Sequence, residues 1–163
     1  EALDFSAISS AALDIRDRLN DLGLASLPMV SGGKGIHVIV PLKPAMEWPQ
    51  AKAFCKGFAR MLAADEPDRF PANISKARRK GRLFVDYLRN ERGSTAICPF
   101  SVRSREGAPV AVPVTWDEVP GLQAANGFSL AAAAERARDN AWPNYFRRKQ
   151  TLTARVLEAV GAE

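Results

Sequence analysis

The sequence is poor in residues that build metal centres and covalent cross-links. Its 163 residues include two cysteines, Cys55 and Cys98, and one histidine, His37. No Cys/His cluster has zinc-site spacing, and the apolar surroundings of both cysteines indicate buried free thiols in a reducing compartment, with a disulfide as the alternative. No apolar run approaches the roughly 18 residues of a membrane span, and the polar, acidic first residues do not suggest a signal peptide.

Acidic residues are scarce in one 30-residue segment of the chain. Residues 76–105 hold nine Lys or Arg and two acids, a net charge of +7, whereas the whole chain carries +5. A balanced protein with one basic segment predicts a localised polyanion site, and a solvated basic surface is the alternative. The cations that open this segment, and that we assign to nucleic-acid binding, are Lys76, Arg78, Arg79 and Lys80.

Helical and strand patterns follow one another without regular alternation, which predicts an α+β domain with a mixed or antiparallel sheet flanked by helices. Predicted strands cover residues 27–30, 36–40, 83–88, 95–98 and, interrupted by prolines and so at a sheet edge, 109–114. Predicted helices cover roughly 15 residues up to Gly23, then 48–64, a short start at 115–118, 129–140 and about 145–160, with one turn at 75–80.

A glycine-rich loop between the first two predicted strands is the strongest chemical signal. Residues 31–37 read Ser-Gly-Gly-Lys-Gly-Ile-His. Glycines allow positive φ and close approach to a ligand, and their N–H groups can converge on an anion. Ser31 adds a hydroxyl and Lys34 a mobile cation, so the loop suits a polyphosphate, although the spacing of a Walker A loop is absent. His37 has three interpretations: a hydrogen-bond donor to a phosphate, an acid/base group or a core residue.

A carboxylate interrupts the apolar run at residues 83–88. On an extended strand Asp86 shares a face with Phe84 and Leu88. A buried acid requires a partner, so Asp86 is either paired with a nearby arginine or is a ligand of a divalent metal beside a triphosphate.

Two arginines stand two residues apart in the segment 99–109. On an extended chain Arg103 and Arg105 point the same way, and paired guanidinium groups match phosphate oxygens. The alternative is a surface turn carrying two solvated arginines.

Taken together and in this order, the motifs Ser-Gly-Gly-Lys-Gly-Ile-His (31–37), Phe-Val-Asp-Tyr-Leu-Arg-Asn (84–90) and Ser-Val-Arg-Ser-Arg-Glu-Gly-Ala-Pro-Val (101–110) closely resemble the polymerase domain of bacterial DNA ligase D. That domain belongs to the archaeo-eukaryotic primase superfamily, and the resemblance covers the chain to about residue 145. It implies a primase-like sheet and nucleotidyl transfer to DNA ends during non-homologous end joining in the bacterial cytosol or nucleoid.

The resemblance also implies roles for individual residues. Asp86 would be a catalytic ligand of Mn²⁺ or Mg²⁺ in a two-metal site. Primer-template DNA ends, a Ku-like end-binding protein and a ligase domain are the implied partners, with no membrane. The implied contacts to the nucleoside triphosphate are Ser31, Gly33, Lys34, Gly35, His37, Arg89, Arg103 and Arg105.

One departure from the family pattern decides the expected activity. The family binds its metals with three aspartates, two of them in an Asp-x-Asp pair, and this sequence contains no Asp-x-Asp. We therefore interpret residues 1–163 as the C-terminal part of such a domain, truncated on its N-terminal side, with a core to about residue 145 and a helix at about 145–160. Such a piece is expected to bind nucleotide with little activity alone, and its open sheet edges are sites of self-association.

The same residues are also consistent with a second function. The chain would then be a non-catalytic nucleic-acid-binding module that uses residues 76–105 and binds DNA with a strong dependence on salt.

Overall fold

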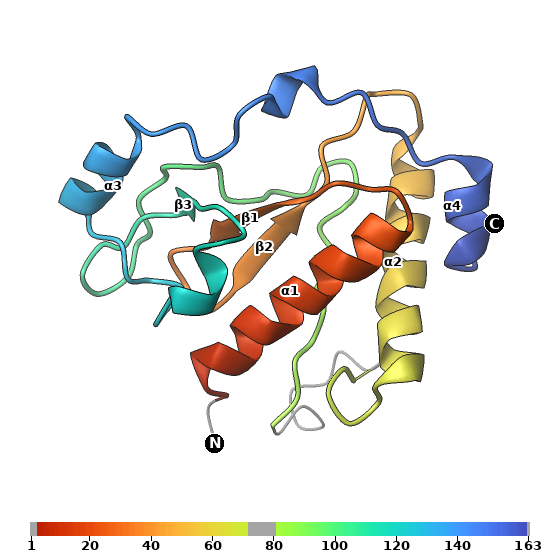
Figure 1. Cartoon of the computed structure of the whole chain (residues 1–163), viewed down its shortest axis with the longest axis horizontal. Coiled ribbons are helices and arrows are strands. Elements are labelled where there is room, and N and C mark those ends of the chain that lie inside the picture. Colours follow the sequence, from red (N-terminus) through yellow and green to blue (C-terminus); the bar gives the residue numbers. More distant parts are fainter. Residues whose placement is uncertain (1–2, 72–80, 163) are drawn as a thin grey trace. The chain divides into compact units, whose positions relative to one another are not determined.

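The computed structural model describes residues 3–71 and 81–162, and its helices and small antiparallel sheet confirm the predicted α+β class (Figure 1). Contacts divide the chain into two units. Unit 1 comprises residues 1–3, 42–96 and 150–163, and unit 2 comprises residues 4–41 and 97–149. No helix in the described ranges is long and apolar enough to cross a membrane.

The sheet of unit 2 has the strand order β2-β1-β3. β1 (Leu27–Val30) and β2 (Ile36–Ile39) confirm the first two predicted strands, and they pair as an antiparallel hairpin. β3 (Val112–Pro113) pairs with β1 and lies at an edge of the described sheet, as predicted, but it is shorter than expected. α1 (Phe5–Asp21) packs against β2, and the two run side by side in Figure 1.

The core of unit 2 holds the strand that leads into the glycine loop. Val30 pairs with Val112 across the sheet, and both side chains are fully buried with Val110 and Ala133. Burying a valine contributes roughly 1.5–3 kcal/mol, so the end of β1 is firmly placed. Ala133 comes from α3 (Leu130–Arg136), whose N-cap Ser129 accepts a hydrogen bond from the Ala132 N–H. Between β3 and α3 lies the 3₁₀ turn η2 (Val119–Gly121).

Unit 1 contains the longest helix, α2 (Trp48–Asp65), and the short helix α4 (Ala154–Ala159). A capping box between Glu47 and Gln50 and a proline in the first turn start α2. Gly57 allows α4 to approach, because a Cβ at that position would lie 2.3 Å from the Val160 carbonyl oxygen. An absent side chain therefore determines the contact between the two helices.

Two predicted strands of the central region do not form. Residues 83–88 and 95–98 are irregular because local hydrogen bonds replace a ladder. The Asp86 carboxylate accepts the Leu88 N–H at 3.0 Å, and Asn90 N–H donates to the Tyr87 carbonyl at 3.2 Å, which turns the chain. The Thr95 carbonyl accepts a bond from Arg89.

The predicted C-terminal helix at 145–160 is also wrong as a single element. It consists of the 3₁₀ turn η3 (Tyr145–Arg147), extended chain and α4, because Arg148 is extended with φ −68° and ψ 126° and Thr153 caps a new helix start. α3 ends at Arg136 instead of residue 140, and residues 115–118 form a turn before η2. The predicted turn at 75–80 lies outside the described residues.

Both cysteines are free, as predicted, but they differ in burial. Burial raises the pKa of the Cys55 thiol to about 11. Cys98 is exposed, contrary to the expectation, because it stands in the irregular segment that was predicted to be a strand.

Candidate functional site

The glycine loop joins β1 to β2 and is closed by its own serine. Ser31 N–H donates to the Gly35 carbonyl at 3.0 Å. The Ser31 hydroxyl oxygen accepts the N–H groups of Gly33 at 3.2 Å and Gly35 at 3.3 Å. The prediction that these amides point into an anion site is therefore corrected, because they converge on Ser31 Oγ and Ser31 organises the loop.

Gly32 is the position where the loop depends most on glycine. It has φ +62°, whereas Gly33 and Gly35 do not have positive φ. A Cβ on Gly32 would lie 2.8 Å from Arg103 Cγ and 2.9 Å from the Val110 carbonyl carbon. Its N–H donates to the Ala125 carbonyl at 3.0 Å. The loop thus lies directly against the segment that carries the paired arginines.

A tight turn presents those arginines. Arg103 N–H donates to the Pro109 carbonyl at 2.8 Å and Ala108 N–H donates to the Arg105 carbonyl at 2.9 Å. An isolated bridge pairs Val102 with Val110. Ala108 has φ +43°, a left-handed conformation that costs a non-glycine residue about 1–3 kcal/mol and that recurs at ligand sites.

The structure brings both predicted arginines to the glycine loop. Arg103 Nη1 donates to the Ser31 carbonyl at 3.2 Å. A Cβ on Gly33 would lie 3.8 Å from Cζ and Nε of Arg105. Segments separated by 72 positions in the sequence therefore place two guanidinium groups beside one loop, with the exposed Lys34 at its tip.

His37 lies on β2 opposite Met29 and is half-buried. It comes two residues after the loop, on the strand that begins at Ile36. Its role as a hydrogen-bond donor to a nucleotide phosphate remains a prediction.

Two of the described site residues, Asp86 and Arg89, belong to unit 1. Asp86 is exposed, and among the described residues no lysine or arginine forms an ion pair with it. Arg89 is also exposed and donates to the Thr95 carbonyl at 2.8 Å. Convergence of Asp86 and Arg89 with the loop of unit 2 remains a prediction. Lys76, Arg78, Arg79 and Lys80 lie outside the described residues.

Few side chains in the described ranges are placed to bind a metal ion. Within residues 3–71 and 81–162 there is no group of three or more His, Cys, Asp or Glu side chains that could hold a metal ion. Asp86 already accepts one backbone hydrogen bond, so the described residues offer an isolated carboxylate and do not fit a two-metal centre.

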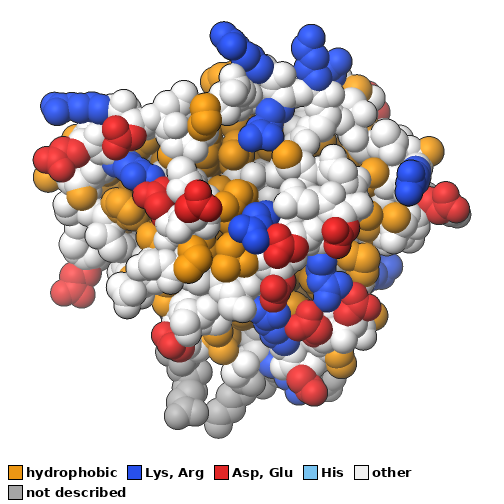
Figure 2. Space-filling view, viewed as in Figure 1, with side chains coloured by type: hydrophobic (Ala, Val, Ile, Leu, Met, Phe, Trp, Pro, Cys, Tyr) orange, Lys and Arg blue, Asp and Glu red, His pale blue; other side chains and the backbone are white. Residues whose placement is uncertain are grey.

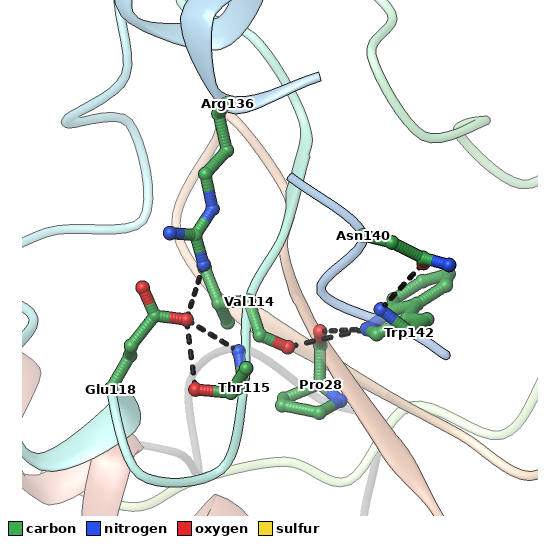
Figure 3. Close-up of polar contacts among 7 residues, drawn as sticks. All are labelled: Pro28, Val114, Thr115, Glu118, Arg136, Asn140 and Trp142. Carbon is green, nitrogen blue, oxygen red and sulfur yellow. Dashed lines mark hydrogen bonds and ion pairs between the residues drawn. The ribbon is translucent and has the colours of Figure 1, made fainter. Parts of the chain in front are cut away.

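Two polar anchors in unit 2 were not identified from the sequence (Figure 3). Glu118 forms an ion pair with Arg136 and accepts the Thr115 N–H at 2.7 Å and hydroxyl at 2.9 Å. Burial alone raises the Glu118 pKa, but the hydrogen bonds from Thr115 and Arg136 outweigh it, so the pKa is lowered. Trp142 Nε1 donates to the carbonyls of Pro28 at 3.1 Å and Val114 at 3.2 Å.

The sequence did carry a signal for the second anchor. Residues 142–149 hold three aromatic side chains followed by three basic ones, but the expectation of one helix at 145–160 concealed this pattern.

Comparison with known proteins places the chain in a family. The family model described as LigD, primase-polymerase domain, matches residues 1–143. The multifunctional non-homologous end joining protein LigD of Pseudomonas aeruginosa is 40% identical over 147 residues, which cover 88% of this chain and 18% of that protein. The bifunctional LigD of Bacillus subtilis is 30% identical over 150 residues, which cover 90% of this chain and 24% of that protein.

A solved structure agrees with these sequence matches. The polymerase domain from Mycobacterium tuberculosis ligase D, in complex with DNA, has a TM-score of 0.78 and 31% identity, covering 88% of this chain and 50% of that chain. The chain therefore spans about half of that domain and about a fifth of the two curated relatives.

Proposed function

The chain belongs to the LigD primase-polymerase family, and on that basis we propose that it is part of a nucleotidyltransferase that extends DNA ends in non-homologous end joining. Membership confirms the resemblance drawn from the three sequence motifs at the level of family. The observation that carries the proposal for this chain is the placement of Arg103 and Arg105 against the loop of residues 31–35.

The loop and the two arginines are proposed to hold the triphosphate of the incoming nucleotide. Guanidinium groups remain charged and match phosphate oxygens in pairs, and Lys34 adds an exposed ammonium group. Three cations at one loop neutralise the charge that develops on the phosphates during displacement. In this proposal Ser31 keeps the loop in shape, and His37 donates to a phosphate oxygen from the start of β2.

The metal-dependent part of the reaction is not supplied by the described residues alone. Family members are nucleotidyltransferases that generally use divalent metals. This sequence has no Asp-x-Asp pair, and Asp86 is an isolated carboxylate in the described ranges. We therefore propose that the chain on its own binds nucleotide and extends a primer weakly or not at all, with Asp86 as its single contribution to metal binding.

The proposed partners follow from the family. The M. tuberculosis neighbour is in complex with DNA, and DNA ends are the proposed substrate here. A Ku-like protein and a ligase domain are further proposed partners. Self-association is proposed through β2 and β3, which are the edges of the described sheet.

The test of nucleotide binding compares two lysines of equal charge. Fluorescent ATP is titrated against the unchanged chain, Lys34→Ala and Lys43→Ala, where Lys43 is an exposed lysine of unit 1. We expect Lys34→Ala to weaken binding about fivefold or more, as loss of one charge-assisted contact predicts, while Lys43→Ala binds normally. Equal affinities of all three proteins would contradict the proposal.

The DNA complex of the solved neighbour also favours the second candidate, a nucleic-acid-binding module. That function predicts strong salt dependence of DNA binding and indifference to free nucleotide. Arg79→Ala would weaken DNA binding under the second candidate, whereas Lys34→Ala would weaken nucleotide binding under the first.

A further inference from the structure

The segment 142–149 carries an aromatic side chain that is exposed to solvent. Its eight residues include Trp142, Tyr145, Phe146 and three consecutive cations, and they contain no acid. The Phe146 side chain is 95% exposed, more than any other large apolar residue in the described ranges. Several Lys and Arg side chains stand out from the surface near the stretch that carries η3 (Figure 2).

The exposed ring belongs to an anchored aromatic series. Trp142 is fixed by its two hydrogen bonds to the carbonyls of Pro28 and Val114 (Figure 3). Tyr145 stacks on Trp142 with ring centroids 5.7 Å apart and an interplanar angle of 18°. Phe146 meets Tyr145 edge to face at 4.9 Å and 83°. The ring of Phe146 is therefore held at a defined place while it remains in solvent.

The backbone conformation at Asn144 also keeps Phe146 in solvent. Asn144 has φ +65°, and this left-handed residue starts the 3₁₀ turn η3. A left-handed residue other than glycine costs roughly 1 kcal/mol, although asparagine tolerates it best. The turn places Phe146 and Arg147 in solvent, followed by the half-buried Arg148 and the exposed Lys149.

We propose that this segment is a contact for single-stranded DNA, in which Phe146 stacks on an unpaired base and Arg147 and Lys149 neutralise neighbouring phosphates. Proteins bind unpaired strands by combining aromatic stacking with positive charge. A flat base suits a ring that is open on its faces, and three cations without an acid suit a polyanion. The inference relies on the proposed function for the kind of partner, DNA, and assigns the contact to residues distinct from the glycine loop.

The test uses a short fluorescein-labelled oligothymidylate and the full chain. Phe146→Ala should bind it at least about fivefold more weakly, and Phe146→Trp should bind normally because the stacking surface is kept. Leu130→Ala is the matched control, since Leu130 is 63% exposed in the same unit and should not matter. Because Phe146 is solvent-exposed, its replacement should leave the thermal unfolding midpoint unchanged.

The roles of Arg147 and Lys149 are tested by measuring how the affinity for the oligonucleotide depends on salt concentration. Arg147→Ala and Lys149→Ala should each flatten the dependence of log affinity on log salt by about 0.7, the value for one phosphate contact on a single strand. Lys43→Ala, on unit 1, should leave the slope unchanged.

Several outcomes would overturn the contact. They are undetectable binding by the unchanged chain, equal binding by Phe146→Ala, or an equal loss in Leu130→Ala. If Phe146→Ala instead abolishes dimers in sedimentation and leaves oligonucleotide affinity intact, the ring is a contact between copies and the proposal is wrong. Titration of Phe146→Ala with fluorescent ATP should match the unchanged chain, so failure of this contact and failure of the nucleotide site are separate results.

Discussion

Arg103 donates a hydrogen bond from its guanidinium Nη1 to the carbonyl oxygen of Ser31, at 3.2 Å. The bond joins the turn that carries the paired arginines to the first residue of the glycine loop. It orients the Arg103 guanidinium while leaving further N–H groups of the same side chain for an anion. The proposed triphosphate contacts are therefore partly arranged before any ligand arrives.

Nucleotide binding should depend on the planar shape of the Arg103 guanidinium group and not only on its positive charge. Arg103→Lys retains the positive charge but loses the planar fork, so fluorescent ATP should bind about fivefold more weakly, as loss of about 1 kcal/mol predicts. Replacing both Arg103 and Arg105 with alanine should weaken binding further, whereas Arg155→Ala on α4 serves as an exposed control. Unchanged affinity in the double variant would show that the arginines are only surface charges.

Gly32→Ala should disrupt the loop. The new Cβ would meet Arg103 Cγ at 2.8 Å and backbone atoms at 2.9 and 3.0 Å, in a left-handed conformation. We expect a loss of about 1–3 kcal/mol in the free energy of unfolding and weaker nucleotide binding. Gly35→Ala is the control, because nothing lies within 4 Å of its Cβ position. Urea unfolding of both variants checks the expectation, and equal stability would contradict it.

Gly57→Ala should destabilise unit 1 even though alanine favours a helix. Alanine would gain about 1 kcal/mol of helix propensity, but its methyl group would lie 2.3 Å from the Val160 carbonyl oxygen. The helices must move apart, and a net loss of about 1–3 kcal/mol is expected. Gly121→Ala, with open space at its Cβ position, should change stability little. A more stable Gly57→Ala protein in urea would show that α4 does not pack on this helix.

The two thiols should react at different rates. Cys98 is exposed, whereas burial raises the Cys55 pKa from 9.0 to about 11. At pH 8 a disulfide reagent should modify one thiol quickly and the second only after unfolding, because the thiolate is the reactive form. Cys98→Ser should remove the fast phase. The neutral Cys55 thiol favours the fold below pH 9, and this contribution should decline as the pH rises through about 11.

Glu118 should make the free energy of unfolding fall as the solution becomes acidic. Its pKa is lowered in the folded chain, so its contribution is present above the ordinary value of 4.5 and is lost as the pH falls through the lowered value. Glu118→Gln should cost about 1 kcal/mol at neutral pH, a modest figure because the side chain is partly exposed, and should reduce the acid sensitivity. Glu135→Gln, an exposed change on α3, is the comparison in urea unfolding at two pH values.

The sequence predicted the elements that have strong local signals. The helices at α1 and α2 and the strands on either side of the glycine loop are confirmed, because periodicity, caps and glycine act over a few residues. The proximity of Arg103 to Ser31 could be expected only through the family resemblance, since 72 positions separate them.

The failures have a common physical origin. Residues 83–88 form an apolar run that Asp86 interrupts, but the Asp86 carboxylate accepts the Leu88 N–H and no ladder forms in the described ranges. Both ends of residues 145–160 are helical, but the extended Arg148 ends the first turn and Thr153 caps a separate helix. Side-chain to backbone bonds of this kind compete with regular structure and leave little trace in hydrophobic periodicity.

The indole of Trp142 has a practical consequence for anyone who shortens this chain. The Pro28 carbonyl accepts both this indole N–H and the Val114 N–H, so the tryptophan continues the β1–β3 pairing beyond the last backbone bond. A version that stopped at residue 141 would keep β1, β2 and β3 and still leave the Val114 carbonyl without this donor. Such trimming would remove the indole together with η3 and α4, and loss of the indole alone should loosen the sheet that carries the glycine loop.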